Sequence, residues 1–219
     1  MSNARRLKYM EKSNKKQEIT EAALKLFSVQ GFEATSISQI ADAVNIQKAS
    51  LYSHFESKQA ILDALVKDIL EQYSAHSIFA NADWDDPKFT QNKEIMTYEV
   101  AVKMVMKHVH YILNDPYIRM GRKMLVIEQF QNEELSALLT KQNYTDVMKY
   151  FIGLMNYLIR CGTLINDDSE LMAAELCLPI TVWISLCDRE PEREPEVMDL
   201  IDRHIRHFFK IYGKSDITA

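Results

Sequence analysis

Apolar residues recur with helical spacing near the start of the chain. From Lys15 onward they occupy positions i, i+3, i+4, i+7 and i+8, namely Ile19, Ala22, Ala23, Leu26 and Phe27. This spacing predicts an amphipathic helix with one buried face. Gly31 predicts a left-handed stop at the end of this helix, and Phe32 is expected to fold back onto its last turn.

Two short helices and one long helix are predicted next. Thr35 is expected to cap a short helix with the inward positions Ile37, Ile40, Ala41 and Val44. Asn45 lies where that helix must end, and asparagine tolerates positive φ better than most residues. The following helix buries Leu51 and Phe55, and Ser57 caps a long helix with the apolar face Ile61, Leu62, Leu65, Val66, Ile69 and Tyr73. This succession is typical of a helix-turn-helix motif.

The rest of the chain predicts a second helical body without a linker rich in Pro, Gly or Ser. Breaks are expected at 83–87, 114–116, Gly162 and 188–195, with four or five helices of roughly 15–25 residues between them. The longest nearly apolar run, 176–187, is shorter than the roughly 20 residues of a membrane-spanning helix. We therefore expect a buried core helix there, no membrane segment and an all-α fold.

Composition agrees with a helical intracellular protein. Glycine and proline number only 5 each, fewer than turn-rich β folds need. The three cysteines, Cys161, Cys177 and Cys187, form no C-x-x-C pair, which predicts free thiols in a reducing compartment. The first residues lack an apolar stretch of signal-peptide type, which predicts a cytoplasmic protein.

The net charge of −5 is divided unevenly along the chain, with +2 on residues 1–70 and −7 on residues 71–219. The first 16 residues alone carry +5. Such a segment is typical of an arm that contacts phosphates, because neutralising them releases counterions. We predict a basic, flexible arm over residues 1–14; a solvated tail without a partner is the alternative.

The helix-turn-helix segment also matches a known family signature. Over residues 17–65 the sequence resembles TetR-type (TetR/AcrR) transcriptional regulators at Gly31, Phe32, Thr35, Ile40, Ala41, Lys48, Leu51, Tyr52, His54, Phe55 and Lys58. It departs from their pattern where Asn45 and Ala49 replace glycines and Gln47 replaces a serine. The resemblance implies an N-terminal three-helix helix-turn-helix DNA-binding domain, residues 15–58. A C-terminal helical effector-binding and dimerisation domain, residues 59–219, is expected to follow.

The second helix of such a motif enters the major groove with its first residues facing the base edges. These residues are Gln47, Lys48, Ala49 and Ser50. Glutamine can pair with adenine, lysine can donate to guanine, and the Ala49 methyl group can pack on a thymine methyl group.

Phosphate contacts are expected around this helix. The resemblance implies them for Tyr52 and His54. Thr35 and Ser36 open one helix and Lys58 opens another, so that free N–H groups and helix dipoles are expected to point at phosphates there.

The last helix carries a continuous apolar stripe on one side. Together with residues 171–187 it resembles the family's two-helix dimer face, which pairs into a four-helix bundle. The predicted interface consists of Trp183, Leu200, Ile201, His204, Ile205, Phe208 and Tyr212. The alternative is that both helices belong to the core of a single chain.

The middle helices are rich in methionine and aromatic residues. Because methionine walls adapt to ligand shape, we predict a pocket for a small hydrophobic or aromatic effector. Its predicted lining is Met104, Met120, Met124, Phe130, Tyr150, Met155 and Tyr157. Such stripes also occur in ordinary cores, and that alternative stays open.

The sequence offers no motif for catalysis or metal binding. His108 and His110 point in different directions on a helix, and nothing completes a metal site around His204 and His207. Phosphate-binding loops and nucleophile motifs are missing. We therefore expect no enzyme activity, metal or cofactor.

The sequence predicts a homodimeric bacterial transcription regulator that acts as a repressor. A small molecule would release it from an inverted-repeat operator on double-stranded DNA. The alternative is a helical adaptor of the same fold that acts through protein contacts without binding DNA.

Overall fold

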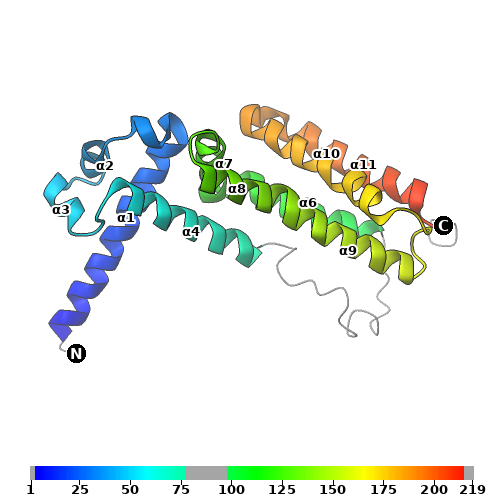
Figure 1. Cartoon of the computed structure of the whole chain (residues 1–219), viewed down its shortest axis with the longest axis horizontal. Helices are drawn as coiled ribbons and strands as arrows, with labels where there is room; N and C mark the ends of the chain where they lie inside the picture. The colour runs from blue at the N-terminus through cyan, green and yellow to red at the C-terminus, as the bar shows by residue number, and fades with distance from the viewer. Residues whose placement is uncertain (1–2, 77–97, 215–219) are drawn as a thin grey trace. The chain divides into compact units, whose positions relative to one another are not determined.

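The computed structural model describes residues 3–76 and 98–214, which are almost wholly helical (Figure 1). The all-α fold class is therefore confirmed for these residues. They form two compact units, residues 1–73 with 116–136 and residues 74–115 with 137–219. The predicted break at 83–87 and the side chains of residues 1–13 lie outside what is described.

The N-terminal unit contains α1 (Asn3–Ala34), α2 (Ile37–Ala43), α3 (Lys48–Tyr52), α4 (Lys58–His76) and α7 (Pro116–Glu128). Two features differ from expectation. Helix α1 already begins at Asn3, within the segment that was expected to be a flexible arm. Helix α7, expected in the C-terminal domain, packs against α1 in this unit.

Local chemistry sets the helix ends where the sequence predicts them. Gly31 has φ 82° and ψ 168° and interrupts the last turn of α1. Phe32 folds back so that its ring meets Phe27 edge-on, with 5.4 Å between the ring centroids. The Ser57 hydroxyl accepts the N–H of Ala60 at 3.0 Å and caps the start of α4. These three predictions are confirmed.

The C-terminal unit is built from α6 (Tyr98–Asn114), α9 (Asp146–Arg160), α10 (Ser169–Arg189) and α11 (Glu194–Tyr212). Helix α8 (Glu133–Thr140) leads through a π-helical turn, η1 (Lys141–Thr145), into α9. The predicted breaks at 114–116, Gly162 and 188–195 are confirmed. Residues 98–214 hold six α-helices rather than four or five, because an additional break at 129–132 carries neither glycine nor proline.

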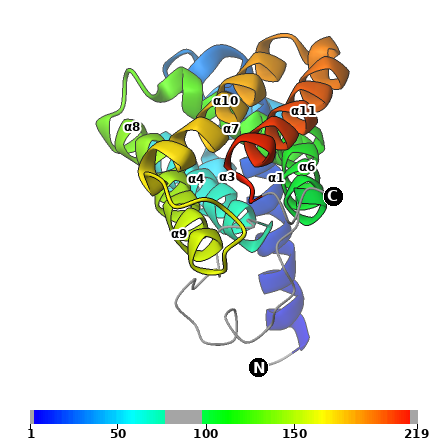
Figure 2. The same ribbon diagram turned by 90° about the vertical axis from the view of Figure 1, so that its right-hand side faces the viewer.

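Helix α10 lies beside α11 and also packs against α9 (Figure 2). Among the described residues it is the one helix whose length and composition would allow it to cross a membrane. One side of this helix is buried in the unit, through Met172, Ala173, Leu176, Cys177, Ile180 and Cys187, whereas Leu171 and Val182 are exposed. The predicted burial therefore holds for one side of the helix. Burial raises the pKa of the Cys177 thiol to about 11, so this cysteine stays protonated and behaves as an apolar residue.

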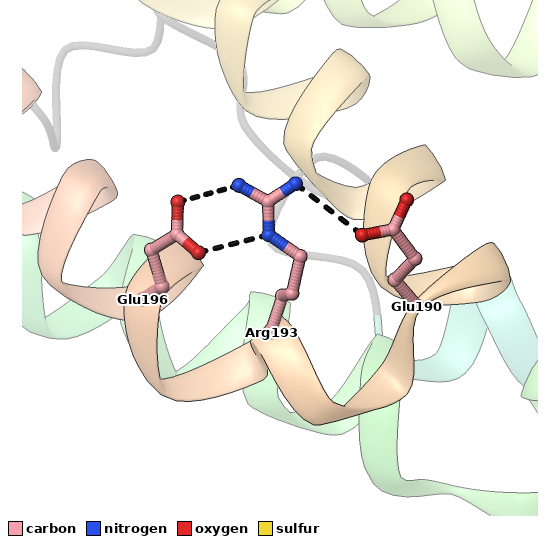
Figure 3. A network of polar contacts seen from close by, with 3 residues as sticks. All are labelled: Glu190, Arg193 and Glu196. Carbon is pink, nitrogen blue, oxygen red and sulfur yellow. Dashed lines mark hydrogen bonds and ion pairs between the residues drawn. The ribbon is translucent and has the colours of Figure 1, made fainter.

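Arg193 fastens the turn between α10 and α11 (Figure 3). Its Nε and Nη2 donate to the two carboxylate oxygens of Glu196 at 2.8 and 2.7 Å, and Nη1 lies 3.3 Å from Glu190 Oε2. The hydrogen bonds from Arg193 lower the pKa of Glu196. Because ion pairs in contact with solvent contribute little stability, this network orients the turn more than it stabilises the unit.

Candidate nucleic-acid interface

A tight turn joins α2 and α3. Helix α2 opens with a capping box, in which Ser36 Oγ accepts the Gln39 N–H at 3.2 Å and Gln39 Oε1 accepts the Ser36 N–H at 2.7 Å. Asn45 has φ 54°, as expected at the turn, and the next residue, Ile46, donates its N–H to the carbonyl of Ala41 at 3.0 Å. The helix-turn-helix motif predicted from the sequence is confirmed.

Helix α3 has one buried and one exposed side. Leu51 is fully buried, and Phe55 just beyond the helix is also buried, so both anchor α3 on the N-terminal unit. The opposite side presents polar and small side chains to solvent, namely Gln47, Lys48, Ala49, Ser50 and Tyr52. The side chain of Tyr52 is 47% exposed. The five residues have the exposure that base and phosphate contacts require.

Thr35 does not share this exposed position. Its hydroxyl donates to the carbonyl of Gly31 at 2.7 Å and accepts from Gln30 Nε2 at 3.0 Å, and its N–H donates to the Phe32 carbonyl. The side chain is buried. The expectation of a phosphate contact is therefore corrected for Thr35, because its polar groups bind within the unit. The helix cap and the exposed hydroxyl belong to Ser36 instead.

Lys58 also has a different role from the one expected. Its ammonium Nζ lies 2.6 Å from the carbonyl oxygen of Phe32, 3.0 Å from that of Thr35 and 3.4 Å from that of Glu33. The same ammonium lies 4.1 Å from the centroid of the Phe32 ring. Lys58 therefore caps the C-terminal end of α1 rather than pointing at phosphate.

Two further polar side chains lie close to α3. His54 is half-buried directly after the helix. The exposed Lys16 on α1 places its ammonium 5.2 Å from the centroid of the Phe55 ring. In the sequence, Lys16 is marked only by the excess of positive charge in the N-terminal segment, and nothing else in the sequence indicates a role for it near α3.

A second candidate site is a cavity in the C-terminal unit, with about 460 Å³ of space between atoms, part of it open to solvent. Helices α6, α9, α10 and α11 all contribute apolar walls, including Met104, Tyr150, Met155, Leu176, Ile205 and Phe209. Burial raises the pKa of Tyr150 to about 12, so its hydroxyl is protonated at neutral pH. The walls suit an apolar ligand.

Three of the predicted pocket residues, Met104, Tyr150 and Met155, line this cavity, and four do not. Met120 and Met124 lie on α7 in the N-terminal unit. Phe130 follows α7 and is 85% exposed. Tyr157 is buried on α9 outside the lining. Helical spacing identified apolar faces correctly but not the unit into which each face packs. The structure therefore does not bring these four residues into one pocket with the other three.

The apolar stripe of α11 faces the core of its own unit, because α11 packs against α6 and α10. Ile201, Ile205 and Phe208 are buried there, which corrects their expected place in an interface between two copies. For these three residues the alternative applies, namely that the helix belongs to the core of a single chain. The remaining predicted interface residues keep partial exposure: Trp183, Leu200, His204 and Tyr212.

A helix-turn-helix motif that exposes the first residues of its second helix, within described residues that are almost wholly helical, has the architecture of a DNA-binding protein. Residues 19–65 match the family model of bacterial regulatory proteins of the tetR family. This segment of the chain is therefore similar to the DNA-binding domain of TetR-family transcription regulators, as the signature residues indicated.

Two named transcriptional regulators are similar in sequence to part of this chain. Over 105 residues the chain is 33% identical to IcaR, the HTH-type negative transcriptional regulator of the biofilm operon icaADBC in Staphylococcus aureus (strain Newman), covering 48% of this chain and 50% of that protein. It is 38% identical over 60 residues to the HTH-type transcriptional repressor KstR2 of Rhodococcus jostii (strain RHA1), covering 27% of this chain and 29% of KstR2. The matches thus span half or less of the curated relatives' length.

Solved structures show how far the fold is shared. SmeT, the repressor of the Stenotrophomonas maltophilia multidrug efflux pump SmeDEF, is similar over 93% of both chains with a TM-score of 0.59 and 17% sequence identity. A SmeT–triclosan complex gives a TM-score of 0.61 at 15% identity, over 93% of this chain and 94% of that chain. At these identities the solved structures show a shared fold, while IcaR and KstR2 are transcriptional regulators by name.

Proposed function

We propose that this chain is a cytoplasmic transcription regulator that binds an inverted repeat in double-stranded DNA as a homodimer. It acts as a repressor that a small apolar molecule releases from DNA. The observation that carries the proposal is the exposed start of α3, where Gln47, Lys48, Ala49 and Ser50 face solvent while Leu51 fixes the helix from behind. This arrangement lets side chains reach base edges without disturbing the fold.

The contacts divide into two kinds. Gln47 and Lys48 read base edges, because an amide and an ammonium can donate to the acceptors of the major groove. Ser36, Tyr52 and His54 position the unit on phosphates, which give affinity without sequence preference. In this proposal Thr35 and Lys58 support the DNA-binding surface from behind, since their polar groups bind within the unit.

The second part of the proposal concerns the effector. The cavity in the C-terminal unit is lined by apolar side chains and the phenol of Tyr150. Such walls favour an aromatic or aliphatic molecule with few polar groups. The complex of the similarly folded SmeT with triclosan, a molecule of that kind, supports this ligand class.

A dimer of this chain would use the outward faces of α10 and α11. Val182 on α10 is exposed, as are His207 and Ile211 on α11, although the inner stripe of α11 is buried. A two-fold dimer presents two identical α3 helices, so the operator is expected to be an inverted repeat.

The proposal is tested by selecting sequences from a random double-stranded DNA library with the full-length protein. We expect enrichment of one inverted repeat and a dimer-sized complex in sedimentation. A library that shows no enrichment, together with retention of a partner protein, would support the adaptor alternative instead.

Replacing Tyr52 with phenylalanine should lower DNA affinity about threefold to tenfold, because one hydrogen bond is worth roughly 0.5–1.5 kcal/mol. The loss should be similar for the selected operator and for its point variants, since phosphate contacts position the protein without specifying sequence. Fluorescence anisotropy measures both. The exposed Tyr144, replaced in the same way, serves as control and should change nothing. A changed order of preference among the point variants would place Tyr52 at a base.

Replacing Met155 with tryptophan should abolish the response to an apolar effector, because the larger side chain fills the cavity. Triclosan and related aromatic probes are titrated while the melting temperature is followed, since a ligand that binds the folded state raises it. Met120→Trp is the matched control, since Met120 lies in the other unit. If the probe still raised the melting temperature of Met155→Trp but no longer raised that of Met120→Trp, the ligand site would lie in the N-terminal unit instead.

A further inference from the structure

Helix α7 ends in a buried carboxylate at the junction between α1 and α2. Glu128 is 5% exposed, and its Oε1 accepts the backbone N–H of Phe32 at 2.7 Å. Burying a carboxylate lowers the stability of a protein unless the carboxylate is hydrogen-bonded, so the hydrogen bond from the Phe32 N–H is needed to keep Glu128 buried. Glu128 also lies outside residues 19–65, the segment that the family model covers.

The junction residue Phe32 is held from opposite sides. Its N–H binds the carboxylate of Glu128, and its carbonyl accepts from the ammonium of Lys58 at 2.6 Å. Its ring packs on Phe27 of α1. Three helices, α7, α4 and α1, therefore fix one backbone position just before Ser36 opens α2.

Gly31 allows this close approach. Its φ of +82° is unfavourable for residues with a side chain. A Cβ atom at this position would also stand 3.2 Å from Glu128 Oε1 and 3.3 Å from Ile127 Cγ2. The glycine of the sequence signature thus serves the contact with α7 as well as the break in α1.

Helix α7 is itself anchored on α4. A Cβ at Gly121 would meet the side chain of Ile69 at 2.9 Å, so the two helices approach as closely as a glycine permits. The hydroxyl of Tyr117 donates to Asp68 Oδ2 at 2.5 Å. Glu128 therefore extends from a helix that is fixed at two other points, which suits it to hold a neighbouring segment in place.

We propose that Glu128 is a positioning residue for DNA binding. Its carboxylate fixes the Gly31–Phe32 junction, the junction fixes the start of α2, and α2 with its tight turn sets the orientation of α3. Glu128 thereby aligns the base-reading residues without touching DNA. The inference rests on the proposed DNA-binding function.

The test uses full-length protein and the operator selected by the wild type. Failure of the wild type to select any sequence would refute the proposed function, independently of Glu128. Glu128→Leu removes the acceptor, and Glu128→Gln keeps an oxygen acceptor in nearly the same shape. Glu134→Leu, at an exposed position on α8, is the matched control.

We expect Glu128→Leu to lower affinity about tenfold or more, because hydrogen bonds to charged groups are the stronger ones. Glu128→Gln should lose less than about threefold, and the control should match the wild type. The slope of affinity against salt should stay unchanged in all variants, since no phosphate contact is removed.

Two measurements separate positioning from loss of folding. Affinity is corrected for the active fraction by stoichiometric titration, at a temperature where circular dichroism shows each variant folded. Hydrogen exchange at the Phe32 amide should accelerate in Glu128→Leu and much less in Glu128→Gln. Affinity of Glu128→Leu within twofold of the wild type, a loss fully explained by the unfolded fraction, or a smaller salt slope would each overturn the proposal.

Discussion

Replacing Phe208 with glutamate should unfold the C-terminal unit instead of producing folded monomers. The Phe208 ring is 4% exposed and packs against Phe209 and Tyr212, with centroid separations of 5.9 and 4.9 Å. The substitution removes a buried aromatic ring and introduces a charge without a partner, at a cost of about 4 kcal/mol or more. We expect the melting temperature followed by circular dichroism to fall by roughly 10 °C or more.

Ile211 on the same helix provides the control. It is 52% exposed, so Ile211→Glu should change the free energy of unfolding by no more than about 0.5 kcal/mol. If the outward face of α11 joins two copies, the same variant should shift sedimentation from dimer to monomer. A Phe208→Glu variant that melts with the wild type and sediments as a monomer would show that the inner stripe is the interface.

Local features of the fold could be predicted because they depend on neighbouring residues. Gly31 and Asn45 adopt the positive φ that glycine, without a Cβ, and asparagine tolerate, and Ser57 caps α4 through a hydroxyl close to the helix start. The cap of α2 was misplaced by one residue, at Thr35 rather than Ser36, because both hydroxyls suit that position. The break at 129–132 was missed because it carries no glycine or proline.

The candidate DNA-binding surface could be predicted for a similar reason. The motif alone determines which side of α3 is buried, and Leu51 and Phe55 show that side in the sequence. The roles of buried polar groups could not be predicted. Glu128 follows the apolar residues 124–127, and no sequence pattern distinguishes it from an ordinary surface carboxylate. Its partner Phe32 lies 96 positions away in the chain.

Helical spacing also could not decide what covers an apolar stripe. The methionines of α7 and those lining the cavity show the same pattern in the sequence, although they pack into different units. The stripe of α11 would suit a partner copy as well as α6 and α10. Only tertiary packing separates these cases, because spacing reports which face is apolar and nothing about its neighbour.

Lys58 gives the other large expected effect. Replacing it with methionine should lower the free energy of unfolding by about 2 kcal/mol, because the hydrogen bonds from a charged group to the carbonyls of Phe32 and Thr35 are lost. The side-chain length is nearly kept, so packing on the Phe32 ring changes little. Thermal unfolding of the full-length protein measures the loss, and we expect a melting temperature lower by roughly 4–8 °C.

DNA binding separates this structural role from a phosphate contact. Measured where Lys58→Met is folded, the slope of affinity against salt should equal that of the wild type, because the ammonium of Lys58 binds carbonyls and not DNA. Lys67→Met is the matched control on α4, since its exposed ammonium lies 3.8 Å from Glu71 and contributes little to stability. If the slope of affinity against salt were smaller by about one in Lys58→Met, at an unchanged melting temperature, Lys58 would be shown to contact a DNA phosphate. A lower melting temperature at constant slope would establish that Lys58 supports the recognition helix by holding the end of α1.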